Sequence, residues 1–166
     1  MVIDTSVLIA ILLDEPGAMT FVDAIAVAAT RRVGAPTLVE AAAVMLARKG
    51  PNGGIALDAL LQRLEIEVVP MSVDAAALAR SAYARFGKGI GAPAVLNYGD
   101  CLAYGVAVDM REPLLFAGED FRKTDVVAAE YRASAGHSER AQRVEESLAA
   151  TERPGAREGL GPPTTR

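Results

Sequence analysis

Short apolar segments alternate with helical ones along most of this chain, and that order restricts it to a few folds. Strand-like segments are expected at 2–3, 31–36, 65–70 and 113–117. The spacing of apolar residues predicts helices at 7–13, 19–29, 37–48, 55–64, 74–86 and 100–110, with a last short helix starting at Thr124 and Asp125. Strands that alternate with helices form a mainly parallel sheet covered on both faces. The sequence therefore predicts an α/β fold with three layers, α/β/α.

One domain and a tail are expected. The chain has 166 residues, and 51% of them are apolar, which is ample for one buried core. The last aromatic residue is Tyr131, and beyond about residue 133 charges alternate and Pro and Gly become frequent. Such a segment buries too little apolar surface to offset its ordering entropy. We expect a domain over residues 1–131 and a flexible tail over 132–166, with at most one short helix before disorder.

Composition also restricts the cellular setting. Cys101 is the single cysteine, so neither an intramolecular disulfide nor a cysteine-rich zinc cluster can form. No basic segment and apolar core open the chain as in a signal peptide, because Asp4 interrupts the first apolar run. Every apolar run is far shorter than the roughly 20 residues of a membrane span. We expect a soluble cytoplasmic protein that does not contact membranes.

Four acidic residues lie where apolar elements end. Asp4 follows the first strand, Glu40 lies early in a helix, Asp100 heads an apolar helix, and Asp120 follows the last strand. Each has an ordinary explanation by itself: Asp4 and Asp100 could cap helices, Glu40 could form a capping box with Thr37, and Asp120 could be a loop acid. Several elements of a parallel sheet end at the same edge, however, so the four acids together indicate a site.

A cluster of carboxylates requires a counter-charge. Two carboxylates about 5 Å apart repel by roughly 3 kcal/mol at an effective dielectric constant of 20. The formal net charge of −4 provides no general attraction for nucleic acid, whereas a bound divalent cation would reverse the local sign. Oxygen ligands without usable Cys or His favour Mg²⁺ or Mn²⁺ over zinc.

Four segments resemble the motifs of PIN-domain ribonucleases, and more narrowly of the VapC toxins of type II toxin–antitoxin systems. They are Val-Ile-Asp-Thr-Ser-Val-Leu, Thr-Leu-Val-Glu-Ala-Ala, Leu-Asn-Tyr-Gly-Asp-Cys-Leu-Ala-Tyr and Leu-Leu-Phe-Ala-Gly-Glu-Asp-Phe-Arg-Lys-Thr-Asp. They occur in family order, and the resemblance covers residues 1 to about 127. It implies a PIN-like fold and an endoribonuclease dependent on Mg²⁺ or Mn²⁺. It further implies a homodimer, inhibited by a VapB-type antitoxin that inserts a segment into the catalytic cleft.

Residue by residue, the resemblance assigns the metal-binding and catalytic acids to Asp4, Glu40, Asp100 and Asp120. The fourth match is ambiguous, because Glu119 or Asp125 could complete the coordination instead of Asp120. Thr5 and Ser6 match the hydroxyl pair of the first motif and are expected to bind a metal-bound water or a neighbouring carboxylate, or to cap the helix.

The implied reaction is hydrolysis by a water that the metal activates, which leaves a 5′-phosphate and a 3′-hydroxyl. His137 is the single histidine and falls in the predicted tail, so it is not expected to be catalytic. Arg122 and Lys123 closely follow Asp120 and are the cations most expected to bind RNA, while most others are expected to be solvated charges at helix ends. Tyr98, and Tyr104 with it, could stack on bases or pack in the core.

The same residues bear on three other functions. An aspartyl-phosphate phosphatase is disfavoured, because Ser6 stands where the second Asp of Asp-x-Asp-x-Thr would be. A catalytically silent PIN-fold binding module stays open, as does a PIN ribonuclease that processes RNA without being a toxin. The apolar surplus of the alanine-rich helices indicates a surface for self-association or for the antitoxin.

Overall fold

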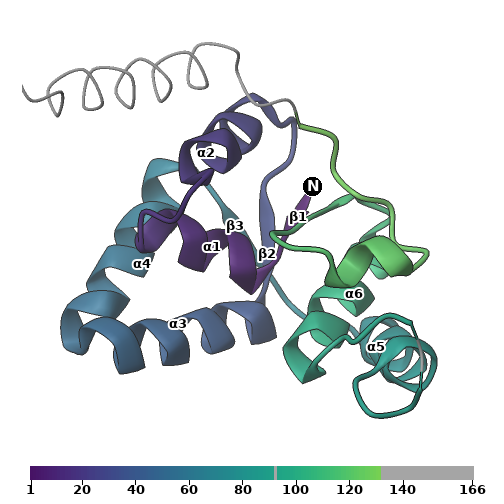
Figure 1. Ribbon diagram of the computed structural model, residues 1–166. Coiled ribbons are helices and arrows are strands. Elements are labelled where there is room, and N and C mark those ends of the chain that lie inside the picture. The colour runs from purple at the N-terminus through teal and green to yellow at the C-terminus, as the bar shows by residue number, and fades with distance from the viewer. Residues whose placement is uncertain (92, 132–166) are drawn as a thin grey trace, which may run out of the picture. The chain divides into compact units, whose positions relative to one another are not determined.

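A computed structural model describes residues 1–91 and 93–131 (Figure 1). The predicted tail over 132–166, and His137 within it, lie outside the described residues. The strands are β1 (Val2–Ile3), β2 (Arg32–Gly34), β3 (Glu67–Val69) and β4 (Leu114–Leu115). The helices are α1 (Thr5–Leu12), α2 (Ala18–Val27), α3 (Ala35–Lys49), α4 (Pro51–Arg63), α5 (Val73–Phe86), α6 (Tyr98–Met110) and the 3₁₀ helix η1 (Asp120–Lys123). Within the two described ranges, no helix is both long enough and apolar enough to cross a membrane.

The strands form one parallel sheet in the order β3-β2-β1-β4, which confirms the predicted sheet. Val2 in β1 is paired with Arg32 on one side and with Leu114 on the other. A parallel bridge between Leu114 and Ala128 extends the pairing beyond β4. The carboxyl ends of all these segments therefore lie at one edge of the sheet.

Helices cover both faces of the sheet, so the predicted three-layer α/β fold is confirmed. Successive strand residues point to opposite faces, and each face has its own core. Ile3 and Leu115 pack with residues of α1, α2, α3 and α4. Val2 and Leu114 pack with residues of α5 and α6. Figure 1 shows α1 to α4 on one side of the strands and α5 and α6 on the other.

Two expected elements differ from the structure. Helix α4 begins at Pro51 rather than near residue 55, and it contains Gly53, whose Cα lies so close to the backbone of Met45 that no side chain would fit. Gly53, which beside Asn52 and Gly54 suggests a turn in the sequence, thus permits close packing of α3 against α4. The prediction of a short helix starting at Thr124 is also wrong. The 3₁₀ helix η1 ends just before Thr124, whose hydroxyl donates to the carbonyl of Phe121 within η1.

Candidate functional site

Asp4 joins β1 to α1 and is almost fully buried, with 2% of its surface exposed. Its Oδ2 accepts hydrogen bonds from the backbone N–H of Ser6 at 2.9 Å and from the Ser6 hydroxyl at 2.6 Å. Its Oδ1 is buried without a hydrogen-bond partner among the described residues. Burial raises the pKa of Asp4, and the nearby charge of Glu40 adds to that rise. One oxygen of Asp4 therefore caps the helix, while the other is left without a hydrogen-bond partner among the described residues.

The two hydroxyl residues after Asp4 orient the acids. Ser6 Oγ donates to Asp4 and accepts a hydrogen bond of 3.0 Å from the backbone N–H of Ala117, just beyond β4. Thr5 Oγ1 donates to Glu40 Oε2 at 2.7 Å. Each hydroxyl thus contacts a carboxylate, as expected, and Ser6 also joins the ends of β1 and β4.

Glu40 lies inside α3 and does not form a capping box with Thr37, the alternative that the sequence left open. The helix begins at Ala35, directly after Gly34 in β2, so Thr37 is a helical residue and not the cap. The Glu40 carboxylate lies against the backbone of Gly99 in α6, where a Cβ would collide with both of its oxygens. This close approach brings the acid on α3 to the start of α6.

Asp100 is the third residue of α6 and forms a capping box with Asn97. Its backbone N–H donates to Asn97 Oδ1 at 3.0 Å, and its Oδ2 accepts from the backbone N–H of Asn97 at 2.7 Å. Burial raises the pKa of Asp100 to about 6, and the charges of Asp4, Asp120 and Glu40 contribute to the rise. Asp100 is therefore within electrostatic range of all three other predicted acids.

The remaining acids have different surroundings. Asp120 is exposed at the start of η1. Glu119 forms an ion pair of 3.0 Å with Arg122. Asp125 accepts a hydrogen bond of 2.7 Å from the Tyr104 hydroxyl and forms an ion pair of 2.7 Å with Arg85. Asp120 is thus the one of the three whose charge acts on Asp100, while the other two are held by cations.

A model of the PIN domain matches residues 1–127 of this chain. The chain belongs to the PIN-domain family. It is 47% identical over 129 residues to ribonuclease VapC28 of Mycobacterium tuberculosis, an alignment that covers 78% of this chain and 97% of that one. Within the PIN-domain family it belongs to the VapC ribonucleases, the toxins of VapBC toxin–antitoxin systems.

Solved structures of this PIN-domain family have the same fold. The sarcin-ricin loop cleaving toxin VapC20 of M. tuberculosis superposes with a TM-score of 0.64 at 15% identity, covering 79% of this chain and 98% of that one. VapBC2 of Rickettsia felis, bound to a promoter DNA fragment, superposes with a TM-score of 0.60 at 16% identity and the same coverage. The family and the fold that the sequence resembles are therefore confirmed.

The acids of this PIN domain fit a hard divalent cation by donor type. They offer oxygen ligands alone, and Asp4 Oδ1 is a buried acceptor without a donor, a costly arrangement unless a cation or a donor binds there. Among residues 1–91 and 93–131, however, no three His, Cys, Asp or Glu side chains stand close enough to form a complete ligand group. The fit of these acids to a divalent cation therefore rests on their oxygen donors and on the unpartnered Oδ1 of Asp4.

The candidate RNA-binding residues differ in exposure. Arg122 and Lys123 are exposed on η1, and Tyr98 is 73% exposed at the start of α6. Tyr104 is buried in the core, where its ring packs, and its hydroxyl donates to Asp125. The sequence interpretation missed Asn97 and Gly99. The Asn-x-x-Asp spacing of a capping box could have identified Asn97, whereas nothing local marks Gly99 as a contact of Glu40.

Proposed function

We propose that this VapC ribonuclease is an endoribonuclease toxin that hydrolyses RNA phosphodiester bonds with Mg²⁺, or with Mn²⁺ in its place. The acids proposed to hold the metal and carry catalysis are Asp4, Glu40, Asp100 and Asp120. The observation that supports this best is the buried, unpartnered Oδ1 of Asp4, which lies on a side chain already fixed by Ser6. A divalent cation at such a site lowers the pKa of a bound water and neutralises charge on the phosphate.

The residues around the acids restrict their orientations before anything binds. Ser6 holds one oxygen of Asp4, Thr5 holds one oxygen of Glu40, and the N–H of Asn97 holds one oxygen of Asp100. Such hydrogen bonds to ligand carboxylates limit their rotation and favour the ionised form. Three acids would thus bind a cation without a large loss of side-chain entropy, and the exposed Asp120 would be the adjustable fourth.

The proposed partners follow from the family. VapC toxins pair with VapB antitoxins, and we propose a VapB-type inhibitor, an RNA substrate and a homodimer in the cytoplasm for this chain. Large apolar side chains are exposed on two adjacent helices, with Val39 at 70% and Leu46 at 60% on α3 and Ile55 at 69% on α4. Exposed apolar side chains of this kind are available for self-association. A sedimentation mass of one chain at micromolar concentration, without antitoxin, would contradict the dimer.

The activity can be tested with purified, antitoxin-free protein and structured RNA in Mg²⁺ or Mn²⁺. We expect cleavage that chelators abolish, and a loss of at least about 100-fold in Asp4→Asn and Asp100→Asn, because each removes a ligand charge. Asp58→Asn is a matched control, since Asp58 is exposed on α4 and is not one of the four proposed acids. Melting curves show whether the variants fold. If the wild-type protein cleaves no RNA with either metal, the proposal is wrong.

A further experiment separates the alternatives that the sequence left open. Induced expression should arrest growth in cells, and co-expression of the cognate antitoxin should restore it. Arrest by the Asp4→Asn variant would identify a silent binding module. Metal-dependent cleavage without growth arrest would identify an RNA-processing enzyme.

A further inference from the structure

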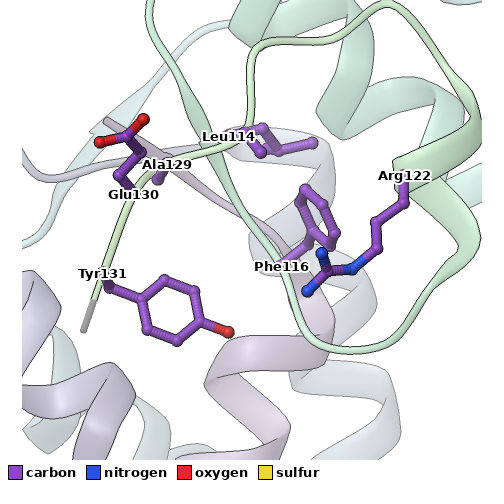
Figure 2. Close-up of a pocket in the computed structure, with 7 residues that line it drawn as sticks. Leu114, Phe116, Arg122, Ala129, Glu130 and Tyr131 are labelled. Carbon is purple, nitrogen blue, oxygen red and sulfur yellow. The ribbon is translucent and has the colours of Figure 1, made fainter. Parts of the chain in front are cut away.

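A hollow of about 640 Å³ lies at the carboxyl edge of the sheet, beside β4. Figure 2 shows Phe116 and Arg122 on one side of it and Tyr131 on the other. The parallel bridge between Leu114 and Ala128 brings the segment around Tyr131 to the same edge as Phe116. The volume is within the range of about 300–1,000 Å³ that is usual for small-ligand sites.

The hollow adjoins the candidate acid site through the chain. Phe116 is followed by Ala117, whose N–H binds the Ser6 hydroxyl that holds Asp4. Arg122 lies on the same short helix as Asp120, two residues later. A nucleotide strand that places its phosphate at the acids could therefore place a neighbouring base in this hollow.

Two aromatic rings line the hollow and are held in place by other rings. Phe116 is 7% exposed and packs on Phe121, with 4.9 Å between ring centroids. Tyr131 is 39% exposed and packs on Phe21 at 5.4 Å. Rings fixed in this way lose little entropy when a base stacks on them, and stacking is the common means of binding single-stranded nucleic acid.

The charged groups favour a base over a phosphate. Arg122 binds Glu119 through Nε, and its two terminal nitrogens pair with no acid among the described residues, so they can donate to a ligand. Glu130 lies on the opposite rim and would repel a phosphate. Guanine presents two acceptors side by side, O6 and N7, which match two donors of a guanidinium, whereas adenine offers an acceptor beside a donor.

We propose that this hollow is a subsite for an unpaired guanine of the RNA, adjacent to the phosphate that is cleaved. The proposal rests on the proposed ribonuclease function. It assigns Tyr131 to stacking, Phe116 to the apolar wall of the hollow and Arg122 to recognition of the guanine edge. Lys123 is next to Arg122 but does not line the hollow, so it has no part in recognition of the guanine.

Direct binding tests the subsite without relying on cleavage. Calorimetric titration of the wild-type protein with guanosine and adenosine 5′-monophosphates should give about tenfold tighter binding of the guanine nucleotide. Arg122→Ala and the charge-preserving Arg122→Lys should both lose that preference, while Lys123→Ala should keep it. Tyr131→Ala should weaken both nucleotides by about tenfold and Tyr131→Phe should not. Melting curves control for folding. Because Arg122 is exposed, its variants should fold, and they test the subsite even if Tyr131→Ala unfolds.

Cleavage of short single-stranded RNAs that differ in one base beside the scissile bond provides the second test. We expect faster cleavage beside guanine in the wild type and in Lys123→Ala, and no preference in Arg122→Ala. Equal binding of the two nucleotides by the wild type would overturn the subsite, as would wild-type behaviour of Arg122→Ala. The subsite would also be overturned if Arg122→Ala changed only the affinity for the antitoxin. Guanine-selective binding without any cleavage would retain the subsite and refute the ribonuclease proposal.

Discussion

Gly99 has no side chain, and the carboxylate of Glu40 occupies the space beside its Cα. Any other residue at this position would push that carboxylate away from the start of α6. The atoms in the way belong to the end of a flexible side chain, so the fold itself can adapt. Gly99 thus affects the placement of an acid more than the stability of the domain.

We therefore expect Gly99→Ala to lose at least about tenfold in RNA cleavage while the free energy of unfolding changes by less than about 1 kcal/mol. The added methyl displaces Glu40, but alanine is also favoured over glycine in a helix by about 0.5–1 kcal/mol. Gly54→Ala in α4 is the matched control, because a Cβ there meets nothing within 4 Å. It should gain stability and keep full activity. Equal activity of both variants would disprove the role of Gly99.

Asp100 makes the stability of the metal-free protein depend on pH. Its pKa rises from 3.8 to about 6, first through burial and then through the other acids. Folding therefore favours the protonated form, so this group's contribution to stability is fully present below pH 3.8 and is lost as the pH rises through about 6.

Asp100→Asn should accordingly be more stable than the wild type at pH 7, by about 1–2 kcal/mol, and equally stable at pH 3.5. The magnitude allows for solvent screening of a partly exposed group, and the Asn amide oxygen can still accept the N–H of Asn97. Urea unfolding in the presence of a chelator measures both values. A difference independent of pH would show that charge is not the cause.

The acids were predictable one by one, whereas their hydrogen-bond partners were less so. Asp4 follows an apolar strand and therefore lies at the sheet edge by topology alone. The capping box that Thr37 and Glu40 could have formed is absent, because α3 begins immediately after β2, two residues before Thr37. Tertiary packing against Gly99, which no local pattern records, sets the position of Glu40 instead.

At the level of elements, Asp125 connects three parts of the structure. It lies after η1, accepts a hydrogen bond from Tyr104 in α6 and pairs with Arg85 at the end of α5. These two partners lower the pKa of Asp125, first the Tyr104 hydroxyl and then Arg85. Burial raises the pKa of Tyr104 to about 12, so its phenol stays protonated and donates. The contacts join the segment that carries Asp120 to the α5–α6 layer.

We predict that Asp125 is a positioning residue and not a metal ligand. Tyr104→Phe should lower the free energy of unfolding by about 1 kcal/mol, since it removes one hydrogen bond to a carboxylate that is half exposed. Asp125→Asn should keep most of the metal-dependent cleavage that Asp120→Asn loses. Cleavage assays at saturating Mn²⁺ measure this. If Asp125→Asn is as inactive as Asp100→Asn, Asp125 completes the metal site.

Helix existence was predictable from periodicity, while several helix ends were not. Helix α5, capped by Ser72, begins at Val73, one residue before the expected start, a small error that reflects ordinary capping. The larger errors at α4 and η1 arise where packing overrides local preference. Gly53 lies within α4 because α3 passes too close for a side chain. The segment after Thr124 is extended, and its bridge from Ala128 to Leu114 replaces the expected helix.

At the scale of the whole molecule, the balance of charged residues changes after Tyr131, close to where the match to the PIN domain ends. Residues up to Tyr131 contain eleven basic and sixteen acidic side chains, and the rest contains six basic and five acidic ones. The PIN-domain match ends at residue 127, and the alignment with VapC28 covers 97% of that protein in 129 residues. Related VapC ribonucleases thus span little more than the domain alone.

A protein shortened to residues 1–132 should therefore fold, melt within about 3 °C of the full chain and cleave RNA at the same rate, because both cores and all four candidate acids are retained. Tyr131 must be kept, since it packs on Phe21. The shortening removes five basic and five acidic side chains and so leaves the net charge unchanged, which should also leave the salt dependence of RNA binding almost unchanged. A shortened protein that folds but loses cleavage would assign residues 133–166 a direct role in the reaction. One that does not fold would place the domain boundary later in the chain.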